Sequence, residues 1–398
     1  MKATVSWGVI AVLVSVYGAA AWGEAERASA SDGFYRLRGG IDNCRMRFLN
    51  DKEGRVAYIG GSITTMKGWR ELTYDLFKTR FPDTEFDFIN AGIGGTNSTL
   101  GAFRFEDHVF KNGPVDLLFL EFAVNDGGTE TPGNRSRRAM EGIIRHARRL
   151  NPHIDIIMQY FADRGKVAAI NAGKIPESIA HHEEVAAHYD VPVIDLAREM
   201  TRRLNDGQFT WEQFSRDSCH PLPFGHQQYA ACIDAFLAAA WAGPPAPETT
   251  PHAMPAPLDP LNYENGRFIA LEAARVRRGW TRDPAWDAEK KCNYGGAVDV
   301  LAAETPGAVL ELEFKGSLIG ISAIAGMDAG ILECRVDGGE VRTVDLFDHY
   351  CKRFHRPVCH VLAEALPPGQ HVLELRMADD NNEASTGHAA RILEFVAN

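Results

Sequence analysis

Three residues of this sequence have the types and settings that nucleophilic catalysis requires. Ser62 follows two glycines at the end of the short apolar run 56–59. Such a run favours a buried parallel strand, and paired glycines allow the sharp turn that presents a hydroxyl at its carboxyl end, where ligands bind in open α/β sheets. A serine hydroxyl is a weak nucleophile and needs a base within hydrogen-bond reach. His220 can be that base, and Asp217, on the same loop, can orient its imidazole.

Two further residues can stabilise negative charge on a reacting carbonyl oxygen. Gly95 lies in a glycine-rich stretch after a predicted strand, and Asn125 follows another apolar strand. The backbone N–H groups of Ser62 and Gly95 and the carboxamide of Asn125 would form an oxyanion hole. Each residue alone is more typical of an ordinary turn, so the interpretation depends on the whole set. Together they predict ester hydrolysis through an acyl-enzyme.

The set resembles the SGNH (GDSL-type) hydrolases, in four motifs that occur in the family's order between residues 55 and 241. Gly61 stands where the name-giving motif has aspartate, a variant that the family tolerates. The resemblance implies a flavodoxin-like three-layer α/β/α domain, with no metal and no organic cofactor. The residues that carry it are Ser62 (nucleophile), Gly95 and Asn125 (oxyanion hole, with the amide of Ser62), and Asp217 and His220 (the Asp-x-x-His motif).

The elements that must position these residues alternate in type along the first half of the chain. Alternating strands and helices specify a parallel sheet with helices on both faces. Residues 33–50 are expected to cover the sheet edge. The predicted strands are 56–59, 86–90, 116–122, 154–160 and 191–195, and the predicted helices are 69–81, 100–110, 135–150, 178–189, one from 197, and 223–240.

The second half of the sequence has a different pattern of apolar residues. Seven prolines in 243–260 predict a stiff, extended linker, and short alternating runs then predict an all-β sandwich, jelly-roll-like in type. We expect this domain to help recognise a polymeric substrate without supplying catalytic groups. The predicted organisation is a signal peptide (1–23), an SGNH hydrolase domain (33–242), a proline-rich linker (243–264) and a β-sandwich (265–398).

Composition and the N-terminus narrow the class of protein. The chain has 398 residues and a net charge of −11, which argues against a nucleic-acid partner. Met1 and Lys2 precede the apolar run 9–16, and small residues at 19–23 suit cleavage. This pattern predicts a signal peptide, with an uncleaved membrane anchor as the alternative. We therefore expect a secreted or periplasmic protein without stable membrane insertion.

The seven cysteines include no Cys-x-x-Cys pair and their spacing predicts no zinc site. Cys351 and Cys359 are close enough to bridge, and buried free thiols are an equal alternative.

Four other stretches invite a functional interpretation. Residues 181–184 (His-His-Glu-Glu) resemble a metal cluster, but consecutive helical residues diverge, so a solvated helix face is the better prediction. His226 is expected to cap or pack the closing helix, with a substrate contact as the alternative, and Asp126 is expected to cap a helix or loop. The aromatic and basic residues of 349–356 either contact a sugar or the cleft, or form a packed connection between strands.

The function predicted from these features is an exported serine esterase that removes acyl groups, with acetyl favoured, from a carbohydrate. Its partner would be a small-molecule or polysaccharide ester. Alternatives in the same family are a lipid or short-chain acyl esterase, a thioesterase or an acyltransferase, although no apolar lid is evident between residues 127 and 135. An alternative of another class is a carbohydrate-binding protein with an inactive hydrolase domain.

Overall fold

The computed structural model describes residues 33–127 and 134–398. By their contacts, residues 35–398 form one compact unit, which holds an α/β region followed by an all-β region. The predicted signal peptide, residues 1–23, lies outside the described residues, as does most of the stretch where the sequence shows no apolar lid.

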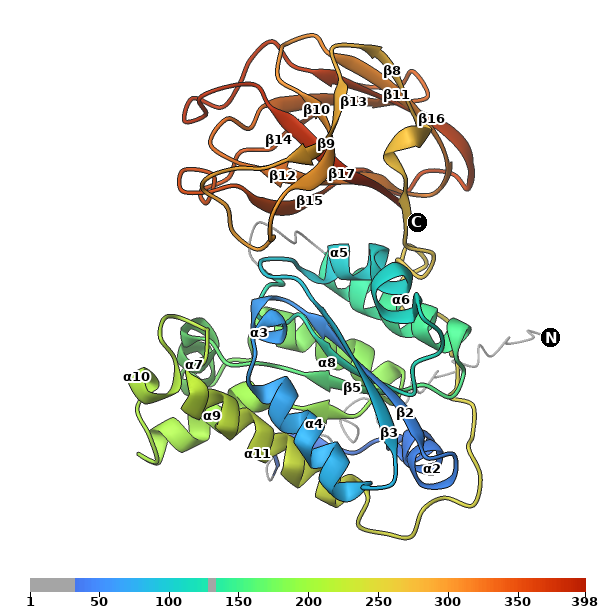
Figure 1. Cartoon of the computed structure of the whole chain (residues 1–398), viewed down its shortest axis with the longest axis vertical. Coiled ribbons are helices and arrows are strands. Elements are labelled where there is room, and N and C mark those ends of the chain that lie inside the picture. Colours follow the sequence, from blue (N-terminus) through green and yellow to red (C-terminus); the bar gives the residue numbers. More distant parts are fainter. Residues whose placement is uncertain (1–32, 128–133) are drawn as a thin grey trace, which may run out of the picture. The chain divides into compact units, whose positions relative to one another are not determined.

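The α/β region is built on a six-stranded sheet of order β1-β6-β5-β4-β2-β3 (Figure 1). Neighbouring strands from β3 to β6 pair in parallel in the flavodoxin-like order, and β1 joins the β6 edge antiparallel. The predicted α/β class is confirmed. The strands are β1 (Tyr35–Arg36), β2 (Glu53–Gly60), β3 (Glu85–Gly92), β4 (Leu117–Glu121), β5 (Asp155–Gln159) and β6 (Val193–Ile194).

Helices connect these strands, and most lie where the hydrophobic period placed them. The predicted helices 135–150 and 223–240 have the observed bounds, but 100–110 divides into a short α-helix and a π-helix. The helices are α2 (Asp42–Asn50), α3 (Ser62–Thr65), α4 (Trp69–Arg80), α5 (Ser98–Phe103), the π-helix η1 (Glu106–Phe110), α6 (Arg135–Leu150), α7 (Arg164–Asn171), α8 (Glu177–His188), α9 (Leu196–Asn205), α10 (Trp211–Phe214) and α11 (Pro223–Ala240).

The central strands are apolar on both sides because helices cover both faces of the sheet. All five residues of β4 are buried, as are Val56 to Ile59 of β2. Tyr58 stacks on Phe119 of the neighbouring strand, with ring centroids 4.8 Å apart. This packing fixes the carboxyl end of β2, from which Ser62 projects.

The all-β region is a sandwich of two antiparallel sheets, which confirms the predicted class (Figure 1). One sheet has the order β15-β12-β17-β10-β9 with β7 beside β17, and the other β14-β13-β16-β11-β8. A 3-10 helix, η2 (Leu271–Ala273), follows β7. The strands are β7 (Arg267–Ile269), β8 (Ala274–Arg278), β9 (Thr281–Trp286), β10 (Val298–Ala303), β11 (Val309–Gly316), β12 (Ile319–Ala325), β13 (Ile331–Val336), β14 (Arg342–Asp345), β15 (Arg356–Ala363), β16 (Gly369–Met377) and β17 (Ala390–Ala397).

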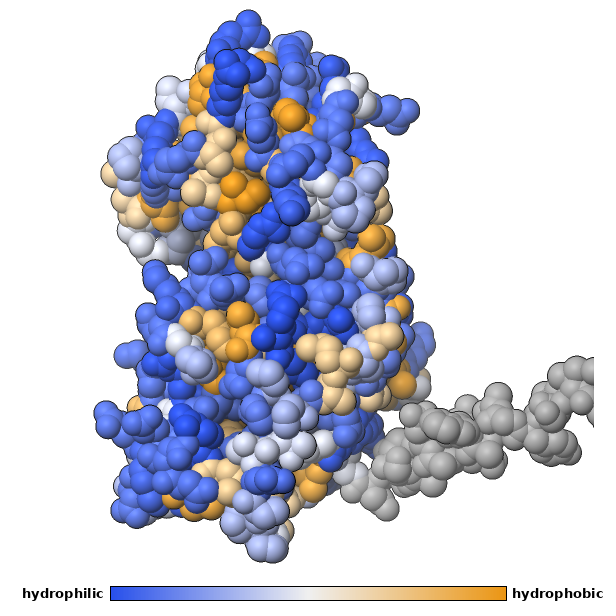
Figure 2. All heavy atoms as spheres, turned by 90° about the vertical axis from the view of Figure 1, so that its right-hand side faces the viewer, coloured by the Kyte–Doolittle hydropathy of each residue, from blue (hydrophilic) through white to orange (hydrophobic). Residues whose placement is uncertain are grey.

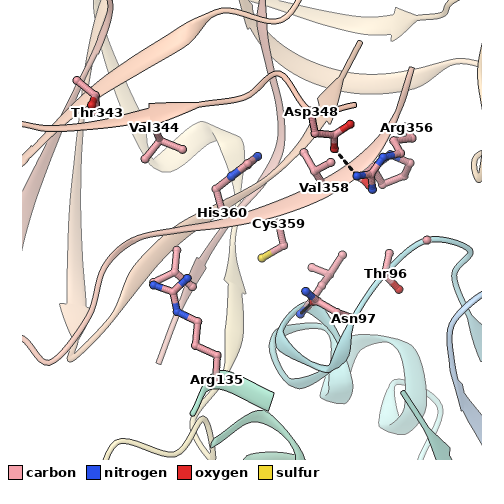
Figure 3. Close-up of a pocket in the computed structure, with 14 residues that line it drawn as sticks. Thr96, Asn97, Arg135, Thr343, Val344, Asp348, Arg356, Val358, Cys359 and His360 are labelled. Carbon is pink, nitrogen blue, oxygen red and sulfur yellow. Dashed lines mark hydrogen bonds and ion pairs between the residues drawn. The ribbon is translucent and has the colours of Figure 1, made fainter. Parts of the chain in front are cut away.

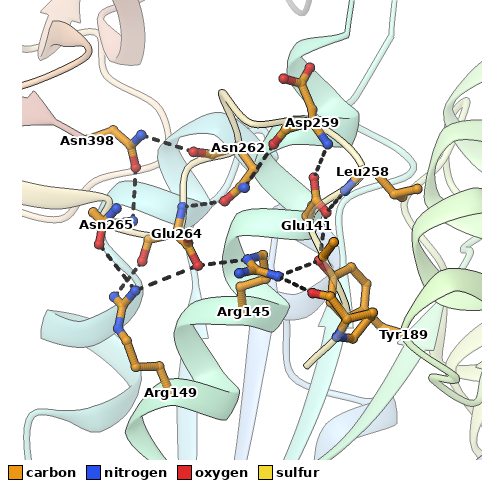
Figure 4. Close-up of polar contacts among 12 residues, drawn as sticks. Glu141, Arg145, Arg149, Tyr189, Leu258, Asp259, Asn262, Glu264, Asn265 and Asn398 are labelled. Atoms are coloured by element: carbon orange, nitrogen blue, oxygen red, sulfur yellow. Dashed lines mark hydrogen bonds and ion pairs between the residues drawn. The ribbon is translucent and has the colours of Figure 1, made fainter. Parts of the chain in front are cut away.

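The proline-rich segment between α11 and β7 contains no helix or strand, yet it is fixed to the α/β region. Glu141 of α6, fully buried, accepts hydrogen bonds from the backbone N–H groups of Leu258 (2.5 Å) and Asp259 (3.0 Å). Arg145, one turn further along α6, donates to Glu264 (2.7 Å; Figure 4). The segment therefore connects the two regions along a defined path.

The end of the chain closes the same polar network. The side chain of Asn398 accepts from the backbone N–H of Asn265 and donates to the carbonyl of Asn262, both at 3.0 Å (Figure 4). Glu364, from the loop after β15, accepts from Arg138 of α6 at 3.1 Å. Helix α6 thus binds the proline-rich segment and a loop of the all-β region, and the chain end binds the same segment.

The surface hydropathy, the helix lengths and the cysteines can be described for the residues that the structure covers. The face in Figure 2 is largely hydrophilic, with apolar residues in small separate groups. Within residues 33–127 and 134–398, no helix has the length and apolar character needed to cross a bilayer. All seven cysteines are free, so Cys351 and Cys359 are not bridged.

Candidate active site

Ser62 begins the short helix α3, directly after the turn at Gly60 and Gly61. A Cβ atom on Gly60 would lie 2.6 Å from the carbonyl oxygen of Glu121, and one on Gly61 would lie 2.1 Å from Oδ1 of Asn125. Glycine at 61 therefore gives the Asn125 carboxamide room to approach the turn. This contact is a physical reason for the departure from the aspartate of the family motif.

The residues predicted as a triad form a hydrogen-bonded chain. His220 Nε2 lies 2.8 Å from Ser62 Oγ, and His220 Nδ1 lies 2.9 Å from Asp217 Oδ2. The other carboxylate oxygen of Asp217 accepts from the backbone N–H groups of Cys219 (2.9 Å) and His220 (2.8 Å). Partial burial raises the pKa of Asp217, but these amides and the imidazole outweigh burial and lower it to about 2. Asp217 is therefore ionised, as an orienting carboxylate must be.

The residues predicted as the oxyanion hole meet at the same place. Ser62, Gly95, Asn125 and His220 line one pocket of about 560 Å³. Gly95 has φ +71°, a left-handed conformation that glycine adopts without strain. The structure thus brings together every residue predicted for the site, with Asp217 bound behind His220.

Buried polar groups hold the turn that carries Asn125. The backbone N–H of Val124 donates to Oε1 of Glu121 (3.2 Å), and that of Asn125 donates to the carbonyl of Phe122 (3.0 Å). Burial raises the pKa of Glu121 to about 8, with the Lys166 cation and the Val124 N–H opposing it. At neutral pH the Glu121 side chain is consequently protonated and uncharged, and it stabilises the turn through its hydrogen bond with Val124.

Asp126, the next residue, has the capping role that the sequence predicts. Its Oδ1 accepts from the backbone N–H of Ser98 at the start of α5 (2.9 Å). Its Oδ2 lies 2.8 Å from His182 Nε2, and both side chains are completely buried. The predicted solvated helix face is therefore wrong for His182, because this side of α8 packs inward against the Asn125 turn.

The neighbours of His182 make structural contacts too. Ser136 Oγ lies 2.9 Å from His181 Nδ1, the hydroxyl of Tyr160 donates to Glu183 (3.0 Å), and Glu184 pairs with an arginine of α6. In the described part of the chain, residues 181–184 do not gather into a group of metal ligands.

His226 packs the closing helix, as predicted. It is buried near the start of α11, and its Nδ1 accepts from the backbone N–H of Trp69 at 3.2 Å. Burial lowers its pKa to about 4. A Cβ on Gly68, whose φ is +144°, would lie 2.3 Å from the His226 ring, so this contact requires glycine.

The sequence did not predict how far the all-β region enters the pocket. Two loops of that region line it, through Cys292 and Asn293 and through residues of 350–356. A Cβ on Gly94 or Gly95 would lie 2.2 or 2.6 Å from the side chain of Asn293. Of the two alternatives predicted for residues 349–356, contact with the cleft is the one observed. No feature of the sequence marks Asn293 as a residue of the pocket.

A second pocket, of about 370 Å³, shares Gly95 and Arg356 with the first. Figure 3 shows strand β15 on one side of it, and Asn97 and Arg135 of the α/β region on the other. Arg356 pairs with Asp348, and burial lowers the pKa of His360 to about 4. Polar and apolar side chains both line this pocket, and it adjoins the predicted oxyanion hole.

A thiol lies beside the triad but is poorly suited to act as a nucleophile. Cys219 lines the pocket, with Sγ 3.5 Å from His220 Nδ1. Burial, and then the Asp217 carboxylate, raise the pKa of Cys219 to about 11. The group is therefore a thiol at neutral pH, and Ser62 is the residue in contact with the imidazole Nε2.

Comparison with known proteins identifies a family match within the α/β region. Residues 58–228 match the sequence model of the GDSL-like lipase/acylhydrolase family. A comparison with curated proteins finds no match.

Two solved structures of a two-domain esterase (CEX) active on acetylated mannans resemble this chain. They cover 91% of this chain and 96% of their own at 21% identity. The TM-score is 0.72 for the form co-crystallised with mannopentaose and 0.74 for the other. At this identity the likeness shows a common fold, which spans both regions.

The family match confirms the resemblance carried by the four motifs. The chain therefore contains, in residues 58–228, a domain of the GDSL-like lipase/acylhydrolase family, and it is a carboxylic ester hydrolase.

Proposed function

We propose that this protein is a serine esterase that removes acyl groups, with acetyl favoured, from carbohydrates. The observation that carries the proposal is the continuous hydrogen-bonded chain Ser62–His220–Asp217, with heavy-atom distances of 2.8 and 2.9 Å. Both distances lie within the range expected of a nucleophile, its base and an orienting carboxylate.

In the proposed reaction His220 accepts the hydroxyl proton of Ser62 as the oxygen attacks the ester carbonyl. The N–H groups of Ser62 and Gly95 and the Asn125 carboxamide then stabilise the tetrahedral oxyanion, and such a donor is typically worth about 3 kcal/mol. Protonated His220 returns the proton to the leaving sugar hydroxyl. Water attacks the acyl-enzyme with His220 again as base, so no metal and no organic cofactor is required.

The sugar that leaves as the alcohol is expected to bind where residues of both regions line the pocket. Tyr350 and Phe354 supply aromatic rings to the pocket of Ser62, and such rings commonly offer an apolar face to a ligand that also forms hydrogen bonds. The adjoining pocket of about 370 Å³ leaves space for neighbouring units of a polymer. The fold shared with an esterase active on acetylated mannans supports the same class of substrate.

The lining favours this substrate over a lipid. Charged side chains, among them Asp163, Arg164 and Arg356, border the pocket of Ser62, so a long acyl chain would place apolar surface against charged groups. The hydrogen-bonded triad argues against an inactive, carbohydrate-binding hydrolase domain. Export to the periplasm or the medium, where such polymers occur, belongs to the same proposal and depends on the N-terminal apolar run.

A single comparison of substrates tests the proposal. The intact protein is assayed on acetylated oligosaccharides, on a short aryl acetate and on long-chain acyl esters, with Ser62→Ala as the blank. We expect release of acetate from the oligosaccharides and little turnover of long-chain esters. Preference for long chains, or transfer of acetyl to a sugar in place of water, would replace the proposal by one of its alternatives.

A further inference from the structure

We propose that Asp217, Cys219 and His220 form an inhibitory binding site for a thiophilic divalent cation such as Zn²⁺. One donor atom from each residue lies within 4.8 Å of the other two, and no other such group occurs among the residues that the structure describes. Carboxylate, thiolate and imidazole are all zinc ligands, and the thiolate distinguishes a soft cation from Mg²⁺ or Ca²⁺.

The distances suit a tetrahedral ion. With bonds of about 2.0 to 2.3 Å, two donor atoms of a tetrahedral zinc site lie roughly 3.3 to 3.7 Å apart. Cys219 Sγ is 3.5 Å from His220 Nδ1, which lies within this range. Asp217 Oδ2 is 2.9 Å from the same nitrogen, because a proton now joins them, and needs to withdraw by only a few tenths of an ångström.

Hydrogen bonds within the loop hold the proposed ligands in place. Asp217 Oδ1 is occupied by the backbone N–H groups of Cys219 and His220. Oδ2, which pairs with His220 Nδ1 and lies 3.7 Å from Nε of the exposed Arg216, is therefore the oxygen that would bind the ion. The side chains of Asp217 and His220 are 45% and 25% exposed, so a hydrated ion can reach them. Water can complete the coordination, as in other sites with three protein ligands.

Occupation of this site would stop the reaction assigned above, and in this respect the inference rests on the proposed function. The cation takes the lone pair of His220 Nδ1, and the single proton of the neutral ring moves to Nε2. The Cys219 thiol releases its proton to solvent, so one proton leaves for each Zn²⁺ bound. Nε2 then carries hydrogen and cannot accept the proton of Ser62. The enzyme would be fully active without metal and reversibly silenced by it.

Binding is tested apart from catalysis, by calorimetric titration of Ser62→Ala with ZnCl₂ in a non-chelating buffer. We expect one site, release of one proton, and a loss of affinity of at least about 10-fold when Cys219→Ser is added. Loss of an outer-shell partner alone already costs about 10- to 100-fold. Cys292→Ser is the matched control, because this cysteine lines the same pocket but is not among the three ligands. Equal affinity in the Cys219 and Cys292 variants would overturn the site.

Inhibition is measured on the otherwise unaltered enzyme with an aryl acetate, each variant relative to its own metal-free rate. We expect Zn²⁺ to inhibit, excess EDTA to restore the rate, and Cys219→Ser to raise the inhibition constant at least about 10-fold. Zinc that binds without slowing turnover would refute the inhibitory role while leaving the esterase assignment intact. If Cys219→Ser does not fold, Cd²⁺ replaces Zn²⁺ on the natural sequence. A thiolate-to-cadmium absorption band that persists in Cys292→Ser supports the site, and its absence from the natural protein would overturn it.

Discussion

The two regions contribute different kinds of residue to one pocket. The α/β region supplies the groups that act on the ester, from the turns after strands β2, β3 and β4 and from the loop between α10 and α11. The all-β region supplies Tyr350, Phe354 and Arg356, which we assign to the alcohol side of a substrate. The reacting groups must be held within tenths of an ångström, which short turns on a buried sheet can do, whereas recognition tolerates longer loops. Chemistry and specificity are thus divided between the regions.

This division changes what removal of the all-β region would measure. If the second domain supplied no catalytic groups, as the sequence predicts, a truncated hydrolase would keep its activity on small esters. The structure places Asn293 against Gly95, and Arg138 of α6 binds Glu364, so truncation would also disturb the catalytic side. Single substitutions on each side of the pocket are the cleaner way to separate the two contributions.

The largest expected effect is that of Ser62→Ala. Loss of the bond-forming oxygen should reduce kcat by about 10⁴- to 10⁶-fold on every ester, because members of a triad act as a unit. A fluorophosphonate probe should label the natural protein and not this variant. Ser218→Ala, at a second serine of the same pocket, is the control and should still be labelled. If the probe labelled Ser62→Ala, the nucleophile would have to be a residue other than Ser62.

Next in size is Asn125→Ala, also on the α/β side. We expect kcat to fall about 100- to 1,000-fold with little change in KM, because an oxyanion donor acts mainly in the transition state. The loss should be equal for an aryl acetate and an acetylated oligosaccharide. A loss confined to the oligosaccharide would mean that Asn125 binds the sugar, and the proposed division would fail.

A smaller and selective effect is expected on the all-β side. Tyr350→Ala should raise KM for an acetylated oligosaccharide by roughly 10-fold, since an aromatic contact is worth about 0.5 to 1.5 kcal/mol beyond its buried area. Turnover of an aryl acetate should change little. Tyr294→Ala is the matched control, because Tyr294 packs near Trp286 and does not line the pocket. Equal losses on both substrates would show that Tyr350 supports the catalytic side.

The smallest effect concerns stability alone. Burial raises the pKa of Glu121 to about 8 from an ordinary value of 4.5, so the folded state holds a proton that the unfolded chain has lost. Its contribution to stability is therefore complete below about pH 4.5 and is lost as pH rises through about 8.

Glu121→Gln should abolish this dependence while keeping the oxygen that accepts from Val124. The pH dependence of stability is measured as the difference between the unfolding temperatures at pH 5 and pH 8. This difference should be smaller in Glu121→Gln than in the natural protein. The exposed Glu383→Gln should leave the difference unaltered. A difference that survives in Glu121→Gln would assign the pH dependence to other groups.

Several strands escaped prediction for identifiable reasons. β8 and β9 carry arginines and mostly exposed residues, so the alternation that marks a half-buried strand is weak. β17 is a central strand that follows the polar loop 379–388, and its sequence does not distinguish it from an irregular chain end. Register and sheet order depend on pairing between distant segments, which local periodicity does not contain.

By itself the sequence determined the two fold classes and the boundaries of long helices such as α6 and α11, and it named the residues that the structure gathers at the candidate site. It could do so because hydrophobic period and turn residues are local, and because Ser62, Asp217 and His220 must follow particular elements to react. Only the tertiary structure decided that His182 is buried beside Asp126, and that Asn293 reaches Gly95. Such contacts join segments distant in sequence, and a side chain's burial is set by what packs against it rather than by its own type.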